Sequence, residues 1–207
     1  MATANPASAV TDLEALAGVG DAVGIVALCD CLELDLAHSV LAVHDSATVY
    51  KAQLLAHLLL GQTDAARFLW KRLPPQMREE PELQALWNVG KARWAKDTAA
   101  ACAALGARQW APPVVPTLAS ALESRLRDDE WATIGLVFSS IRPDTLASRL
   151  GLPVASASEG AAARGWPLEG ECYRPVKPEP AARPVPGADA LRRLTEFVAH
   201  LTAETGA

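Results

Sequence analysis

The sequence predicts a mainly α-helical protein in which a degenerate helical-repeat segment, similar to an α-solenoid, precedes a winged-helix module with a short β wing and a C-terminal amphipathic helix. Apolar residues recur at helical spacing through most of the 207 residues, and one short stretch has the pattern of a β-hairpin. Half of the residues are hydrophobic, so the chain can bury a sizeable core. We therefore expect a helical repeat segment (1–110), a winged-helix module (111–177), a proline-rich linker (178–187) and a C-terminal assembly helix (188–207).

The repeat segment begins with four predicted helices. Helical periodicity covers the ranges 10–17, 23–43 with an interruption near Asp35, and 46–60. Gly61 ends the third helix, and a fourth begins at Thr63. The Pro74-Pro75 pair stops this helix because proline cannot continue the hydrogen-bond ladder. The third and fourth helices should therefore form a helical hairpin.

A second pair of helices repeats this plan. The pattern predicts one helix over residues 82–94 and another over 97–105. Trp87 and Trp94 are seven residues apart, so they share one face of the first helix, and we expect both in the core. Stacked antiparallel pairs resemble an α-solenoid, but the spacing follows no regular period, so the repeat is degenerate.

The next stretch predicts a winged helix. Two amphipathic helices are expected at 117–127 and 129–140, after a proline cluster. A helix-turn-helix follows, with helices at 142–150 and 154–164 around Gly151-Leu152-Pro153. Strands at 166–168 and 171–176, with Glu169 and Gly170 as the turn, then form the wing.

The last predicted helix covers residues 189–203 and follows the proline-rich stretch. Its apolar residues step by three, four and three, which is the seam of a helix that packs against partner helices: Leu191, Leu194, Val198 and Leu201. Burial of each such side chain is worth about 1.5–3 kcal/mol, so it must find a surface to cover it. Assembly with other chains would supply that surface, and folding back on the winged helix is the alternative, because the linker is long enough.

Composition and charge argue against several classes of partner. The net charge of −5 provides no broad positive field for a phosphate backbone, and the second helix of the helix-turn-helix carries Glu159 near its middle. We therefore expect no nucleic-acid partner. No apolar run reaches the roughly 18 residues of a membrane span, and the N-terminus lacks the pattern of a secretion signal, so we expect no membrane partner either.

Catalytic, cofactor and metal sites are not predicted. The four histidines are too scattered for a zinc isopeptidase, which needs two histidines two positions apart: they are His38, His44, His57 and His200. Phosphate loops and nucleophile elbows are missing, as are the C-x-x-C pairs of zinc and redox sites. We expect no enzyme activity, no small-molecule substrate and reduced thiols.

Residues at the end of the fourth predicted helix are candidates for a partner interface. Trp70 stands beside Lys71 and Arg72, and tryptophan is enriched both in cores and at interface hot spots. The two basic residues either complement the negative end of the helix dipole or pair with a partner's carboxylate. The carboxylates that follow, Glu79, Glu80 and Glu82, are better explained as the first turn of the next helix than as an acid/base pair.

The order of a degenerate helical repeat, a winged helix and a terminal helix resembles the PCI family. Members of that family are scaffold subunits of the proteasome lid, the COP-nine signalosome and translation initiation factor three. Residues 66–75, ARFLWKRLPP, are similar to the signalosome branch of the family. The likeness continues in order through LWNVG (86–90), QW (109–110), GLPV (151–154), GW (165–166) and LRRLTEFV (191–198).

The resemblance implies a non-catalytic scaffold subunit of the signalosome, the complex that removes the ubiquitin-like Nedd-eight from cullins and so regulates cullin-RING ubiquitin ligases in cytoplasm and nucleus. It implies other PCI subunits as partners, reached through the winged-helix edge and a C-terminal helix bundle. The alternatives are a PCI subunit of the proteasome lid or of initiation factor three, and a winged-helix DNA-binding regulator. The predicted interface residues are Leu191, Leu194, Phe197, Val198 and Leu201, together with Trp70, Lys71 and Arg72.

Overall fold

A computed structural model describes residues 6–36, 43–177 and 187–205. The chain is mainly helical with a small two-stranded sheet and separates into two compact units, Met1–Val176 and Lys177–Ala207. Within the described ranges, no helix is both long and apolar enough to cross a membrane. Most of the predicted linker, residues 178–186, lies outside the described residues.

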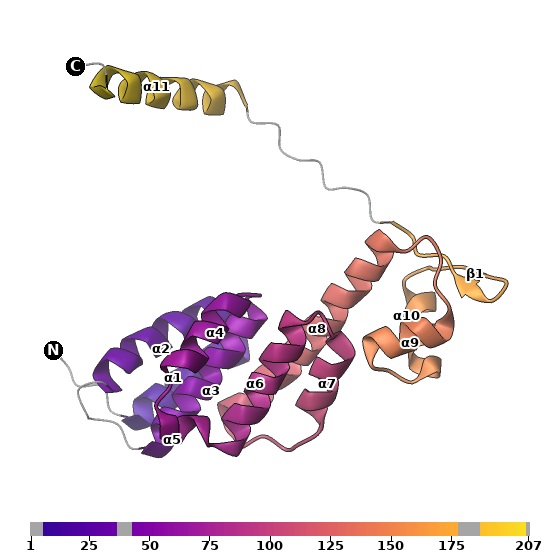
Figure 1. Ribbon diagram of the computed structural model, residues 1–207, viewed down its shortest axis with the longest axis horizontal. Coiled ribbons are helices and arrows are strands. Elements are labelled where there is room, and N and C mark those ends of the chain that lie inside the picture. Colours follow the sequence, from indigo (N-terminus) through magenta and orange to yellow (C-terminus); the bar gives the residue numbers. More distant parts are fainter. Residues whose placement is uncertain (1–5, 37–42, 178–186, 206–207) are drawn as a thin grey trace. The chain divides into compact units, whose positions relative to one another are not determined.

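Helix α3 (Val43–Leu59) is the centre of the first unit and contacts five other helices. Its residues 49–58 are buried on every side, which is typical of a helix surrounded by others. Even Gln53 is fully buried, and its amide donates a 2.7 Å hydrogen bond to Asp30 Oδ1. Around α3 lie α1 (Pro6–Val19), α2 (Ala22–Leu36), α4 (Thr63–Arg72), α6 (Pro81–Trp94) and α8 (Val114–Val137) (Figure 1).

The predicted second pair of helices is present as α6 (Pro81–Trp94) and α7 (Thr98–Gly106). Glu80 caps α6 by accepting a 2.7 Å hydrogen bond from the Leu83 N–H, and Asp97 caps α7 through the Ala100 N–H at 2.9 Å. Of the predicted carboxylates, Glu80 is thus the cap of α6 and Glu82 lies in its first turn, as expected. A short helix that the sequence pattern did not predict, α5 (Pro75–Arg78), precedes α6.

Helix α8 (Val114–Val137) corrects the prediction of two separate helices at 117–127 and 129–140. It begins earlier because Pro116 lies in its first turn, where a missing N–H leaves no hydrogen bond unmade. It continues through the charged residues 127–130 because these pair along the helix or with its neighbours. Its first half belongs to the main hydrophobic core and its second half to a smaller core with Trp131 and Ile134.

The smaller core is covered by α9 (Pro143–Leu150), α10 (Val154–Ala163) and a hairpin. Gly151 ends α9 in the left-handed conformation (φ 63°), which glycine adopts without a steric penalty. Strands β1 (Leu168–Glu169) and β2 (Cys172–Tyr173) pair antiparallel, and Ile141 bridges Tyr173. The predicted hairpin turn was one residue early, because Glu169 pairs with Cys172 and the turn is Gly170-Glu171.

The second unit contains α11 (Ala188–Thr205), which matches the predicted terminal helix. It is strongly amphipathic, with apolar residues on one face and charged residues on the other. Its polar face carries an exposed pair between Arg192 and Glu196, one helical turn apart.

Gly160→Ala tests the packing of α10 on α8. A Cβ at Gly160 would lie 2.7 Å from Cζ2 of Trp131, whose ring is held between Trp166 and Arg164. We expect this overpacking to lower the free energy of unfolding by about 1–3 kcal/mol, measured by urea denaturation. Gly106→Ala is the control, because its Cβ meets nothing within 4 Å. Equal stability of the two variants would contradict the close approach.

Candidate protein-docking site

Helices α4 and α6 lie antiparallel and form a groove edged by aromatic rings. Trp70 of α4 stacks on Trp87 of α6, with ring centroids 5.2 Å apart and planes 4° apart. Trp70 is half-buried and also packs against the main core. One face of the predicted interface residue Trp70 is therefore covered by Trp87 within the fold, and part of its side chain remains exposed.

Trp94 is exposed and Trp87 is only half-buried, so neither is the fully buried core residue that the sequence predicted. Trp94 shares a helix face with Trp87, and two of the residues that line the groove near it, Ala66 and Gly90, are small. Together with Thr63, Arg67 and Lys91 these residues line a cavity of about 450 Å³. The guanidinium of Arg67 lies 5.9 Å from the Trp94 ring centroid, a cation–π contact that orients the indole.

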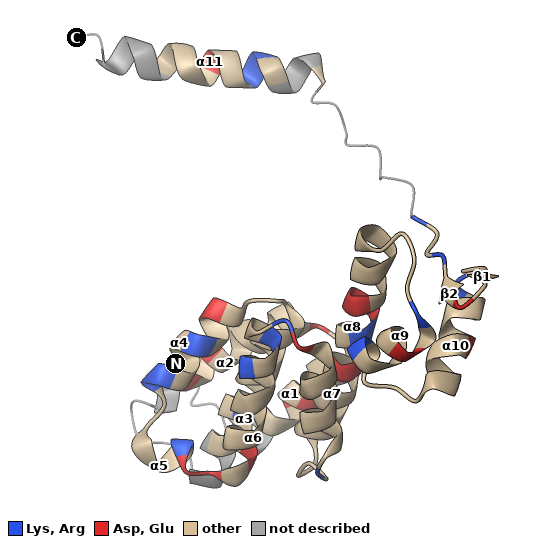
Figure 2. Ribbon diagram, turned by 45° about the vertical axis from the view of Figure 1, so that its right-hand side comes forward, with Lys and Arg blue, Asp and Glu red and all other residues tan. Residues whose placement is uncertain are grey.

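The two basic residues predicted beside Trp70 have different surroundings. Arg72 makes a two-pronged ion pair with Glu33 of α2, with Nε–Oε1 at 2.9 Å and Nη2–Oε2 at 2.6 Å. It thus ties α4 to α2, although about half of its side chain is exposed. Lys71 is exposed, and with Arg67 it gives α4 the basic surface visible in Figure 2.

The predicted interface residues of α11 lie on its apolar face. Leu191, Leu194, Phe197 and Val198 are each between 56% and 60% exposed. The side chain of Leu201, the fifth predicted residue, lies outside the described residues. The terminal helix therefore presents a continuous apolar stripe to solvent, which is unusual for large side chains of a folded chain.

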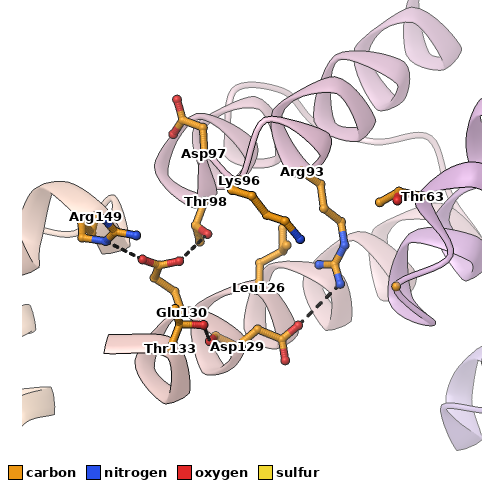
Figure 3. Close-up of a pocket in the computed structure, with 11 residues that line it drawn as sticks. Thr63, Arg93, Lys96, Asp97, Thr98, Leu126, Asp129, Glu130, Thr133 and Arg149 are labelled. Atoms are coloured by element: carbon orange, nitrogen blue, oxygen red, sulfur yellow. Dashed lines mark hydrogen bonds and ion pairs between the residues drawn. The ribbon is translucent and has the colours of Figure 1, made fainter. Parts of the chain in front are cut away.

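A polar cavity of about 370 Å³ lies between the α6–α7 turn, α8 and α9 (Figure 3). Glu130, buried in α8, accepts hydrogen bonds from Arg149 Nε at 2.7 Å and from Thr98 Oγ1 at 3.0 Å. Arg93 pairs with Asp129 at 3.5 Å on the other side of the cavity. These pairs join α6, α7 and α9 to α8, so they stabilise the fold.

Lys51 of α3 fixes the beginning of α6. Its ammonium lies 2.6 Å from Glu82 Oε2 and 2.8 Å from Glu80 Oε1, and the residue is only 6% exposed. Burial alone would raise the pKa of Glu82, but hydrogen bonds from Lys51 and the Ala111 N–H, with the charges of Lys51 and Arg108, hold that pKa below its ordinary value. This cluster positions the helix that carries Trp87 and Trp94.

Two of the four thiols are buried and unreactive. Cys29 and Cys102 are buried, and burial raises the pKa of both, that of Cys29 to about 12, so neither forms the thiolate that a nucleophile requires. In the part of the chain that the structure describes, no group of three or more His, Cys, Asp or Glu side chains is placed to hold a metal ion.

Comparison with known proteins places the chain in a family. The CSN8/PSMD8/EIF3K family model matches residues 45–185, which contain α4, α6 and the hairpin. The COP9 signalosome complex subunit 8 of Danio rerio is 32% identical over 157 residues, covering 74% of this chain and 82% of that protein. The chain belongs to the CSN8/PSMD8/EIF3K family. The Arabidopsis thaliana subunit 8 is 29% identical over 180 residues, covering 86% of this chain and 90% of that protein.

Membership of the CSN8/PSMD8/EIF3K family confirms the resemblance inferred from residues 66–75. These residues form most of α4 and the three positions that follow it. The sequence reasoning did not identify the groove, although one signal was available. Gly90 lies inside α6, where glycine costs about 1 kcal/mol relative to alanine, so an interior glycine indicates that space is needed beside it. Helix α11 lies beyond the family-matched range.

Lys51→Met tests the cluster that positions α6. The change leaves two neighbouring carboxylates without their cation, so we expect the free energy of unfolding at neutral pH to fall by about 3 kcal/mol. Because the folded-state pKa of Glu82 lies below its ordinary value of 4.5, the stabilisation is complete above that value and is lost as pH falls through the folded-state pKa. The difference between wild type and variant should therefore shrink on acidification.

Urea unfolding followed by circular dichroism from neutral pH to about pH 3.5 measures this difference. The control is Arg125→Met, which removes an exposed pair with Asp129 and should cost about 0.5 kcal/mol or less. A Lys51→Met variant no less stable than this control, or a difference independent of pH, would show that the cluster is not an anchor.

Proposed function

We propose that this chain is a non-catalytic scaffold subunit of a signalosome, the complex that removes Nedd-eight from cullins and so regulates cullin-RING ubiquitin ligases in cytoplasm and nucleus. The relatives named as COP9 signalosome complex subunit 8 support the choice of complex. The exposed apolar stripe of α11 is the observation that carries the scaffold role. In this proposal α11 enters a helix bundle shared with other PCI subunits.

The physical case for α11 rests on the area that it leaves in water. Each large side chain of its stripe gains about 1.5–3 kcal/mol when fully buried, and these residues are more than half exposed. A bundle of similar helices would cover them at the three- and four-residue spacing that helix packing uses. Part of that gain is offset by the lost freedom of the associating chains, so several helices together make the more stable assembly.

The unit formed by α9, α10 and the hairpin is proposed to act as a winged helix that docks on a neighbouring subunit. In the described residues β1 pairs only with β2, so its other edge can accept a further strand. Leu168 on β1 is exposed beside this edge. The outer face of α10 carries small residues and Glu159, with Arg164 at its end, which favours a protein neighbour over a nucleic acid.

Purification of the tagged chain from its own cells at moderate salt, with mass spectrometry of the proteins that co-elute at high molecular weight, tests the proposal. Co-elution with other PCI subunits and a zinc isopeptidase would support a signalosome. Co-elution with proteasome-lid subunits or with initiation factor three would assign the chain to a sister complex. Elution as a lone chain, or cleavage of a cullin conjugate by the isolated chain, would contradict the scaffold role.

Leu194→Asp with Val198→Asp tests the assembly helix directly. Two carboxylates on the apolar stripe would have to be desolvated in a bundle, so we expect incorporation into the complex to fall at least about tenfold. The fold of residues 46–176 should remain, as judged by circular dichroism and thermal unfolding of the isolated chain. Arg192→Gln with Ala199→Asp changes the net charge equally on the opposite face and should assemble normally. Normal assembly of the first variant would eliminate α11 as the assembly helix.

A further inference from the structure

The groove between α4 and α6 combines features of a binding site for a peptide segment. Its floor is made by Ala66 and Gly90, and a Cβ added at Gly90 would already lie 3.4 Å from Cε3 of Trp87. Trp87 and Trp94 stand one helical turn to either side of this floor, three residues before and four after Gly90. The space of about 450 Å³ is therefore large enough for a bulky side chain of a partner, and it is open to solvent, where the partner's backbone would lie.

The charges around the groove specify what can enter. Its lining contains two basic residues, Arg67 and Lys91, and no carboxylate. Lys71 adds a third exposed cation on α4, four residues after Arg67, while Asp64 is the acidic residue at the start of that helix. This patch is basic although the whole chain has a net charge of −5. It would attract carboxylates and repel a basic segment.

We propose that this groove binds an acidic segment of a partner protein, which inserts one aromatic or large aliphatic side chain between Trp87 and Trp94 and sets flanking carboxylates against Arg67 and Lys91. Trp94 is 57% exposed yet held by Arg67, so little conformational entropy is lost when a partner covers it. The proposal concerns the first unit alone and holds whether or not α11 carries assembly.

Three other occupants are less suitable. The chain's own α11 has its charged residues on the face opposite the apolar stripe, so seating this stripe would bring no carboxylate toward Arg67 and Lys91. A second copy would bring an equally basic groove to the same place. A single-stranded nucleic acid supplies anions and stacking faces but no aliphatic side chain to bury in the groove, and it is therefore included among the probes of the test below.

The test measures fluorescence anisotropy of labelled probes with the full chain at low salt. The main probe is a peptide of roughly ten residues with one phenylalanine flanked by glutamates. The comparison probes replace the phenylalanine by alanine, or the glutamates by lysines, and two further probes are a peptide of residues 188–205 and a single-stranded oligonucleotide. We expect saturable, salt-sensitive binding of the main probe, weakened roughly tenfold or more by either replacement.

Trp94→Ala and Lys91→Glu should each weaken the main probe roughly tenfold, whereas Arg125→Glu, an exposed arginine of α8 outside the groove, should not. Both groove residues are exposed, so the variants should unfold like wild type, and thermal unfolding checks this. Tighter binding of the 188–205 peptide or the oligonucleotide, self-association abolished by Trp94→Ala, or failure of the main probe to bind saturably would each overturn the proposal.

Discussion

The rest of the first unit depends on α8, because this single helix belongs to both hydrophobic cores. Its first half packs against α1, α3 and α7, and its second half supports α9 and α10. A continuous helix cannot bend sharply without a proline, a bulge or an inserted side chain, so the two cores keep one relative orientation. Glu130 stands at the junction and accepts hydrogen bonds from α7 through Thr98 and from α9 through Arg149. Removing either partner would leave a buried carboxylate incompletely satisfied.

At the same junction the sequence pattern predicted a break between two helices, whereas α8 is continuous there. The charged residues 127–130 look like a loop because a single sequence cannot show which charges find partners. In the fold, Arg127 pairs with Glu123 one turn before it, and Asp128, Asp129 and Glu130 each face an arginine of another element. The helix therefore continues where charge alone would predict a break. The ion pairs with α6, α9 and the end of α10 form only in the folded chain, so the sequence alone could not predict that this helix continues.

Local chemistry predicted much of the rest. The Pro74-Pro75 stop, the Gly151 turn and the periodicity of residues 82–94 and 97–105 each placed an element within a few residues of its observed position. The environment of a helix face was harder to predict. Trp87 and Trp94 share one face, yet one stacks on Trp70 and the other is exposed, because the difference comes from what α4 places opposite each. Likewise the sequence did not predict that Arg72 pairs with Glu33, because this ion pair depends on α2 lying beside α4.

The two candidate contact surfaces differ in a way that has consequences for binding. The groove is built on helices anchored to the core, by Lys51 at the start of α6 and by Arg72 at the end of α4, so it is formed before a partner arrives. A preformed site gains affinity because few side chains must be ordered on binding, and its charges select the partner. The α11 stripe instead consists of similar aliphatic side chains with one phenylalanine, which select mainly by spacing. A subunit with both surfaces can separate the choice of a partner from the burial of apolar area that stabilises an assembly. The free energy of association can then be large at the helix bundle without being specific there, provided that the groove supplies the specificity.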